Sequence, residues 1–219
     1  MNKLRFLVTD IDGTILDRMP IYTQAFVDLL VPFGLDAQAA KTYYLDSAGL
    51  PIDTQFREAI ALVGRSIEQT ELTNIVRRFF VAAGREKVRP FPQARAVLHA
   101  LKAAELVLCA TSGSNTAELM EIFAREDLPY DMVLGSDEVK KGEAHIRLFA
   151  ENFGVSFEDF CVGAIFLGDG PTDMAIAGRC RICACGITTT VDQGKLLTAG
   201  ADHIVASLDE FLALVRSQP

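Results

Sequence analysis

From residue 91 onward, short apolar segments alternate with amphipathic helical ones, and this alternation strongly restricts the possible folds. Residues 106–110 are β-prone, and four apolar residues recur at helical spacing just before them: Ala94, Val97, Leu98 and Leu101. Similar β-prone segments occur at 132–134, 164–167, 181–185 and 203–205, with helical patterns in most of the intervals and a last helix from about 208 to 216. Repeated strand–helix units predict an α/β fold with a parallel sheet between two layers of helices.

Residues from about 17 to 87 do not follow this alternation. They contain helical patterns at 22–33, 37–45, 54–63 and 68–83 and no convincing strand. Prolines at positions 20, 90 and 92 interrupt the chain near both ends of this region. The simplest arrangement is a helical domain inserted after the first strand. We therefore expect a core domain of residues 1–17 and 88–219 and a helical domain of residues 18–87.

The acidic composition limits the partners that this chain can bind. It has 219 residues, a formal net charge of −8 and no run of Lys and Arg, which argues against nucleic acid and anionic membranes. No apolar stretch approaches the ~20 residues that span a bilayer, and no signal segment opens the chain. Five cysteines, an odd count without a secretory signal, favour reduced thiols and a cytoplasmic location. Both a monomer and a homodimer remain open.

Two carboxylates, Asp10 and Asp12, follow the apolar run at 4–8 and precede a glycine turn at Gly13. Carboxylates at the end of a buried strand lose their hydration, and two of them close together repel each other. A cation or a hydrogen-bonding ligand has to offset both costs. The pair therefore predicts that a metal, a phosphoryl group or both complete the site.

Three further polar segments adjoin predicted strands. They are Thr111-Ser112-Gly113 after the strand at 106–110, Lys140-Lys141 before the helix around Ile146, and Gly168 to Asp173 after the strand at 164–167. Each segment alone could be a helix cap, a turn or a solvated surface pair. Ligands of open α/β sheets bind where the carboxyl ends of the strands meet. Taken together with Asp10 and Asp12, the segments indicate one site at that edge.

The order of these segments resembles that of a known superfamily. Asp-x-Asp-Gly-Thr at 10–14, Thr111 at a later strand end, a following lysine, and Gly-Asp-x-x-x-Asp at 168–173 resemble the haloacid dehalogenase (HAD) superfamily. The helical insertion resembles the group with a helical cap, which includes phosphoglycolate phosphatase and β-phosphoglucomutase. The resemblance covers essentially the whole chain. It implies a HAD-like, Rossmann-like three-layer core with a helical cap domain at 18–87.

The resemblance also implies roles for the two carboxylates at the first strand. Asp10 would attack phosphorus and form an aspartyl-phosphate. Asp12 would protonate the leaving oxygen and then activate the water that hydrolyses this intermediate. An acid at position 12 suits phosphate esters, so dehalogenase and phosphonatase chemistry is disfavoured. Thr9 departs from the apolar residue that usually precedes the nucleophile, and Arg18 stands where Ser is common.

The other segments receive metal and substrate roles from the same resemblance. Mg²⁺ would be held by Asp10, the backbone carbonyl of Asp12, Asp169 and Asp173, the last through a water or by orienting Lys141. Lys141, favoured over Lys140, would neutralise charge in the transition state. The substrate-binding group would be Thr111 with backbone N–H groups around Ser112 and Gly113.

These roles imply a Mg²⁺-dependent phosphatase that acts on a small phosphorylated metabolite. The alternatives are a phosphomutase of the β-phosphoglucomutase kind and a phosphate-binding regulatory protein without turnover. Specificity would lie in the cap, where the turn at 46–51 is a candidate specificity loop. Arg57 or Arg65 could contact a second anionic group of the substrate.

Overall fold

The computed structural model describes residues 4–47, 50–84 and 88–217. The chain divides into two compact units, one formed by Met1–Asp17 with Arg89–Pro219 and the other by Arg18–Val88. The boundary after the helical unit lies between Val88 and Arg89, one residue later than expected from the sequence. Among the described residues, no helix combines the length and the apolar character that crossing a membrane requires.

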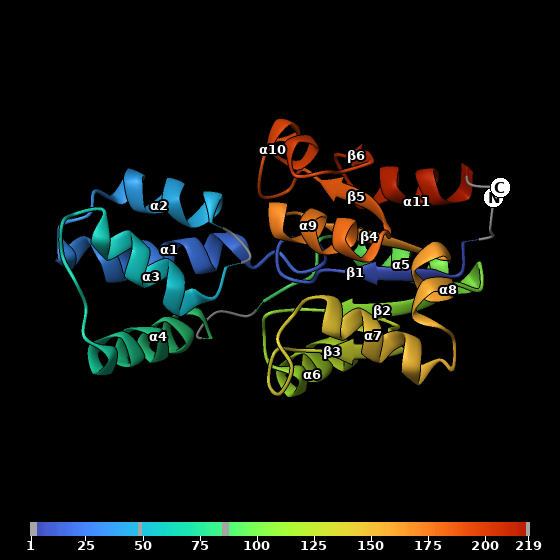
Figure 1. Ribbon diagram of the computed structural model, residues 1–219, viewed down its shortest axis with the longest axis horizontal. Helices are drawn as coiled ribbons and strands as arrows, with labels where there is room; N and C mark the ends of the chain where they lie inside the picture. The colour runs from blue at the N-terminus through green and yellow to red at the C-terminus, as the bar shows by residue number, and fades with distance from the viewer. Residues whose placement is uncertain (1–3, 48–49, 85–87, 218–219) are drawn as a thin grey trace. The chain divides into compact units, whose positions relative to one another are not determined.

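The first unit is built on a six-stranded sheet (Figure 1). Its strands are β1 (Phe6–Thr9), β2 (Val107–Thr111), β3 (Met132–Leu134), β4 (Ala164–Gly168), β5 (Cys183–Ile187) and β6 (His203–Val205). Their order is β3-β2-β1-β4-β5-β6, and every neighbouring pair is parallel. The predicted α/β fold with a parallel sheet is confirmed.

The register of the three central strands aligns the segments that were singled out in the sequence. Thr9 of β1 lies opposite Ala110 of β2 on one side and Leu167 of β4 on the other. The next residues along the three strands are Asp10, which follows β1, and Thr111 and Gly168, which end β2 and β4, so all three lie at the same edge of the sheet. This alignment places residues that are up to about 160 positions apart around one point.

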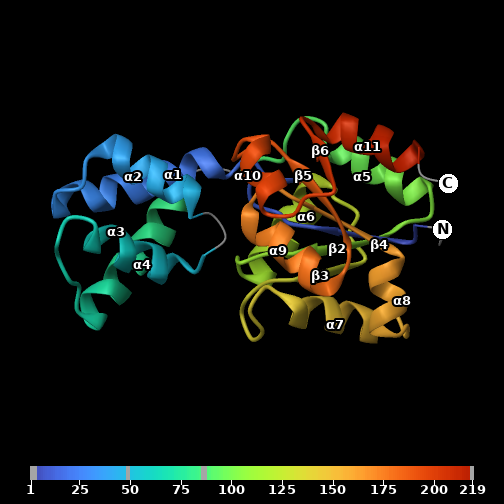
Figure 2. The same cartoon turned by 45° about the horizontal axis from the view of Figure 1, so that its top comes forward.

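Helices cover both faces of this sheet. They are α5 (Ala94–Ala103), α6 (Thr116–Glu126), α7 (Glu143–Asn152), α8 (Phe157–Val162), α9 (Pro171–Cys180), α10 (Gln193–Thr198) and α11 (Leu208–Ser217). Phe149 of α7 and Phe160 of α8 pack in one core cluster with Phe166 of β4. Helices α5 and α11 contact each other and lie on the other side of the sheet from α7 and α8 (Figures 1 and 2). The result is the predicted three-layer arrangement.

Two details of this unit differ from the sequence-based expectation. The strand expected at 181–185 begins at Cys183, because α9 continues to Cys180 and Arg181 ends it with a left-handed φ of 57°. Helices α8 and α10 were not predicted. Each has 6 residues, which is too short to produce a clear helical periodicity.

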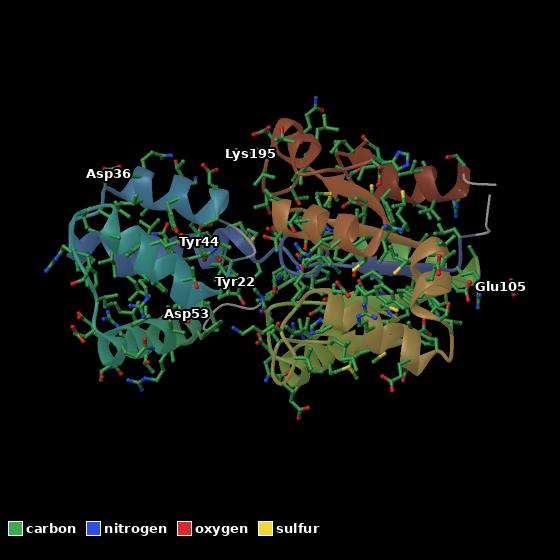
Figure 3. All side chains as sticks on the ribbon, viewed as in Figure 1. Tyr22, Asp36, Tyr44, Asp53, Glu105 and Lys195 are labelled. Carbon is green, nitrogen blue, oxygen red and sulfur yellow. The ribbon has the colours of Figure 1, made fainter. Side chains whose placement is uncertain are left out.

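The second unit is helical. It contains α1 (Met19–Leu30), a 3-10 helix (Val31–Phe33), α2 (Ala37–Asp46), α3 (Ile52–Ala61) and α4 (Gln69–Ala83). All four predicted helices are confirmed, and the described part of the unit has no strand. Asp36, which Figure 3 shows at the start of α2, accepts hydrogen bonds from the amides of Gln38 and Ala39.

Aromatic rings form the centre of this second unit. The ring of Phe26 lies 4.6 Å from that of Phe56 and 4.8 Å from that of Tyr44, and Phe79 packs against Phe56 at 5.8 Å. Phe26, Phe56 and Phe79 are almost completely buried. Since such rings contribute large apolar areas, the unit has a hydrophobic core of its own.

Candidate active site

Asp10 lies directly after β1, in the centre of the sheet edge. Its backbone N–H donates to the carbonyl of Leu167 on β4 at 2.8 Å, which fixes the direction of the chain at this point. Its side chain is buried, and the amine of Lys141 donates to its Oδ1 at 2.5 Å. The same amine lies 2.7 Å from Oδ1 of Asp173. Lys141 thus joins carboxylates that follow two different strands.

The charges of this group depend on one another. Burial raises the pKa of Asp10 well above its usual range against the opposing effect of Lys141, and Asp173, Asp169 and Asp12 raise it further. Burial alone would lower the pKa of Lys141, but Asp10 and Asp173 outweigh it and the pKa is raised. The amine therefore stays charged, and its charge offsets part of the cost of burying a carboxylate at position 10.

Three buried carboxylates form a cluster that fits a divalent cation. Oxygen atoms of Asp10, Asp169 and Asp173 all lie within 4.8 Å of one another. Burial, followed by the charge of Asp173, raises the pKa of Asp169 to about 6, although a hydrogen bond from Thr14 at 2.8 Å opposes this shift. Lys141 supplies one positive charge against three carboxylates. Hard cations such as Mg²⁺ take oxygen ligands of this kind, so the donor set and the excess negative charge both suit one.

Asp12 lies apart from that cluster and is held by two serines. The hydroxyls of Ser112 and Ser114 donate to its Oδ2 at 3.1 and 2.7 Å. Both serines follow β2, whereas Asp12 follows β1. The segment after β2 therefore orients a carboxylate of the segment after β1. The family resemblance implied a metal contact through the backbone carbonyl of Asp12 rather than through its side chain, and that contact stays a prediction.

The turn at Gly13 lies directly against Asp169, in the segment that follows β4. Gly13 has a φ of 91°, and a Cβ atom there would lie 2.1 Å from Oδ2 of Asp169. Its carbonyl accepts a hydrogen bond from Thr189, which follows β5. Only glycine permits this backbone angle and this approach together. The position therefore sets how closely Asp169 can lie to the turn.

Thr111 ends β2 and is hydrogen-bonded to a buried histidine. Its Oγ1 lies 2.7 Å from Nδ1 of His145. The backbone N–H of Ser112 donates to the carbonyl of Leu134 at 3.0 Å, whereas Gly113 is exposed. The amide of Ser112 is thus engaged by the sheet, and of the two expected backbone donors the exposed Gly113 is the better placed.

The two lysines of the third segment differ in their surroundings. Lys140 is exposed, while the side chain of Lys141 is 13% exposed and contacts Asp10 and Asp173. Asp173 also accepts a hydrogen bond from the amide of Gly170 at 3.1 Å, within the first turn of α9. Of the two lysines, Lys141 is therefore the one that contacts the carboxylates at the edge of the sheet.

Several residues near this site had no assigned role in the sequence. Ser114 precedes Asn115, the residue that caps α6, and its hydroxyl donates to Asp12. His145 is completely buried on the apolar face of α7. In a sequence, a histidine in such a position is easily taken for a core residue. Thr189 lies in the run Thr188-Thr189-Thr190 after β5, a fifth polar segment at a strand end. That position after a strand was the available signal.

Thr9, the departure noted before the nucleophile, has a structural partner. Its Oγ1 lies 2.7 Å from the hydroxyl of Tyr130, whose ring stacks on Phe123 at 4.8 Å. Burial raises the pKa of Tyr130, so both groups stay neutral. A buried hydroxyl pair thus occupies a place where an apolar residue is more usual.

The residues proposed for specificity are partly outside the described structure. The turn at 46–51 includes Ala48 and Gly49, which lie outside the described residues. Arg57 donates to Gln69 at 2.8 Å, and Arg65 donates to the carbonyl of Phe33 at 3.1 Å. Both arginines are exposed. Their contacts tie them to their own unit, and a role in substrate binding stays a prediction.

The comparisons with known proteins agree with this geometry. A family model described as haloacid dehalogenase-like hydrolase matches residues 7–187. This match contains Asp10, Thr111, Lys141 and Asp169. The chain belongs to this family. The resemblance given by its motifs is confirmed, while a comparison with curated proteins gives no significant match.

Solved structures of the same fold cover nearly the whole chain of this haloacid dehalogenase-like hydrolase. One from Lactobacillus delbrueckii subsp. bulgaricus, provisionally named phosphoglycolate phosphatase, has a TM-score of 0.83 at 17% identity, covering 99% of this chain and 100% of its own. A predicted phosphatase from Clostridium acetobutylicum has 0.81 at 22%, with coverages of 99% and 100%. One from Bacteroides vulgatus, provisionally named β-phosphoglucomutase, has 0.78 at 18%, with 99% and 91%. At such identities the likeness shows the fold.

Proposed function

We propose that this haloacid dehalogenase-like hydrolase is a Mg²⁺-dependent phosphatase that hydrolyses a small phosphate monoester through an aspartyl-phosphate. The observation that carries the proposal is the position of Lys141 between Asp10 and Asp173. It holds a buried carboxylate in place as a nucleophile and puts a positive charge where a phosphoryl anion would arrive.

The metal that the proposal requires would be held by Asp10, Asp169 and Asp173, with the backbone carbonyl of Asp12 as a further ligand. Bound there, Mg²⁺ would supply positive charge that offsets the repulsion between a carboxylate and a phosphoryl anion. Thr14, by its hydrogen bond to Oδ1 of Asp169, fixes the orientation of one ligand before any metal binds. The excess of carboxylates over ammonium groups in the cluster supports this assignment.

In the first chemical step, an oxygen of Asp10 forms a bond to phosphorus as the bond from phosphorus to the leaving oxygen breaks. Asp12 gives its proton to that oxygen, so the alcohol leaves uncharged. In the second step, Asp12 takes a proton from water, and the water oxygen displaces Asp10 from phosphorus. Ser112 and Ser114 hold the Asp12 carboxylate in one orientation for both transfers.

The rest of the proposal concerns binding. Thr111 and the amide of Gly113 would hold phosphoryl oxygens, and the helical unit at 18–88 would select the alcohol. We also propose a small phosphorylated metabolite as the substrate, no nucleic acid or membrane partner, and a cytoplasmic location. The net charge of −8 and the free state of all five cysteines support these points. The proposal leaves both a monomer and a homodimer open.

A panel of small phosphate esters, assayed for phosphate release with Mg²⁺ and with EDTA, tests this proposal. We expect hydrolysis of p-nitrophenyl phosphate or another panel member with Mg²⁺ and none with EDTA. Asp10→Asn should remove turnover and keep the fold. Lys141→Ala should lower kcat by about 100-fold or more, because it removes a charge-assisted contact in a buried site, while the matched control Lys140→Ala stays near wild type.

Three outcomes would contradict the proposal. Inactivity across the panel would favour a phosphate-binding protein without turnover. Equal losses in the two lysine variants would remove the role of Lys141. Conversion of sugar phosphates to isomers without phosphate release would favour the phosphomutase alternative. The Bacteroides vulgatus structure of the same fold is the reason to include sugar phosphates in the panel.

A further inference from the structure

His145 connects two segments of the candidate site and has no part in the chemistry proposed above. Its side chain is completely buried at the start of α7. Nδ1 lies 2.7 Å from the hydroxyl of Thr111, and Nε2 lies 2.8 Å from the carbonyl of Val139. Val139 precedes Lys141 by two residues. One imidazole ring therefore joins the proposed phosphoryl-binding threonine to the loop that carries the lysine.

The two hydrogen bonds fix the position of the protons. A backbone carbonyl can only accept, so Nε2 of His145 must carry a hydrogen. In the neutral ring Nδ1 then has a lone pair and accepts from Thr111. The single hydroxyl proton of Thr111 is thus directed at His145. With His145 neutral, Thr111 has no proton to give to a phosphoryl oxygen.

This arrangement conflicts with the binding of a dianion. The oxygens of a dianionic phosphoryl group are acceptors only, and they would meet the lone pairs of the Thr111 hydroxyl. A protonated His145 resolves the conflict, because both ring nitrogens then donate. Thr111 accepts from Nδ1, and its own proton becomes available to the phosphoryl oxygen.

We propose that His145 is a positioning residue that sets the direction of the Thr111 hydroxyl proton, so that binding of a dianionic phosphoryl group brings one proton onto its ring. The inference rests on the proposed role of Thr111 as a phosphoryl ligand. The proton comes from solvent, and no covalent bond between heavy atoms forms or breaks. The ligand class is a tetrahedral oxyanion that carries two negative charges.

The surroundings of the ring favour the neutral form while the site is empty of anions. Burial lowers the pKa of His145 and so does the charge of Lys141, whereas the hydrogen bond to Val139 raises it. Lys141 is itself held by Asp10. A bound dianion would add negative charge close to this group and so favour the charged ring.

Other charged groups near α7 have partners of their own. Glu143 and Arg147 of the same helix form an ion pair with each other. Of the helices packed against α7, α9 contributes Asp173, which is held by Lys141, and α8 contributes Asp159, which accepts from Ser156. Of the charged groups named here, Lys141 is the one that shifts the pKa of the ring, in addition to burial and the hydrogen bond to Val139.

Sulfate is a suitable probe, since it is a tetrahedral dianion whose charge stays the same throughout the pH range of interest. Calorimetric titration of the Mg²⁺-supplemented protein in buffers of different ionisation enthalpy counts the protons that accompany binding. We expect the wild type to take up about one proton more per sulfate than His145→Asn does. Its sulfate affinity should rise by up to about tenfold for each unit that the pH falls between the free and bound pKa of the ring.

Two substitutions separate the hydrogen bond that His145 makes to Thr111 from the one that it makes to Val139. In His145→Asn the amide takes the place of Nδ1, and because it can turn either end to Thr111, the hydroxyl proton is released without proton uptake. In His145→Gln the amide takes the place of Nε2, so the bond to Val139 is kept and the one to Thr111 is lost. Both variants should bind sulfate with a flatter pH dependence. Thr111→Val provides the same test if either variant does not fold.

The ¹⁵N chemical shifts of His145 give a readout that a purely structural role would not move. We expect the neutral Nε2–H tautomer in the free protein at neutral pH and the imidazolium in the sulfate complex. Sulfate binding that leaves the ring neutral, or equal proton uptake in wild type and His145→Asn, would overturn this inference alone. Absence of sulfate binding at every pH would contradict the role of Thr111 and the inference with it.

Discussion

At the scale of single residues, the site depends on a close approach between Gly13 and Asp169. The turn after Asp12 runs so near to the Asp169 carboxylate that no side chain fits between them. Thr14, the next residue, donates to the same carboxylate. The segment that carries the proposed nucleophile thus also positions a proposed metal ligand. Substitution of this one glycine should therefore affect folding and metal binding together.

A non-glycine residue at a positive φ costs about 1–3 kcal/mol. We expect Gly13→Ala to lower the free energy of unfolding by more than this amount. The added Cβ would lie 2.1 Å from Oδ2 of Asp169 and force that carboxylate to move. Gly200→Ala is the matched control in the same unit, with a φ of 104° and nothing within 4 Å of the Cβ. Urea unfolding of both variants measures the difference, and equal losses would contradict this explanation.

At the scale of helices and strands, Thr9 and Tyr130 join elements that are not neighbours in the sheet. Thr9 ends β1, and Tyr130 lies just before β3, on the far side of β2. Their hydroxyls meet at 2.7 Å in the interior. A buried hydroxyl without a partner is costly, so this pair favours one relative position of the two elements.

The double-mutant cycle of Thr9→Val and Tyr130→Phe tests this connection. Each single substitution should cost about 1–3 kcal/mol of unfolding free energy, because the remaining hydroxyl loses its buried partner. The double variant should cost less than the sum, with a coupling of about 0.5 kcal/mol or more. Chemical denaturation of the four proteins gives these values. Additive losses would show that the two hydroxyls do not depend on each other.

The strand ends were predictable from the sequence because apolar runs and the polar residues after them are both local signals. Asp10, Thr111 and Asp169 could be assigned to one edge of a parallel sheet before any contact was known. The pair of Thr9 and Tyr130 could not, because its members are 121 residues apart and no motif connects them. His145 was missed for a different reason. A buried histidine on an apolar helix face has the pattern of a core residue.

At the scale of the whole molecule, a net charge of −8 gives an anionic substrate no general attraction. Binding must come from local charge, which Lys141 and the proposed metal would supply. The two units have separate hydrophobic cores, so substitutions in the core of one unit need not disturb the packing of the other. The residues that carry this local charge could be identified from the sequence, whereas no motif identifies the side chains that would select the proposed substrate.

The most direct measurement of the central claim is the chemical trapping of the acyl phosphate. Enzyme turning over p-nitrophenyl phosphate with Mg²⁺ is quenched and treated with borohydride, which reduces an aspartyl-phosphate to homoserine, and its peptides are analysed by mass spectrometry. The account predicts homoserine at position 10 and at no other aspartate. Turnover in which Asp10 stays unmodified while another residue carries the reduced group would contradict it.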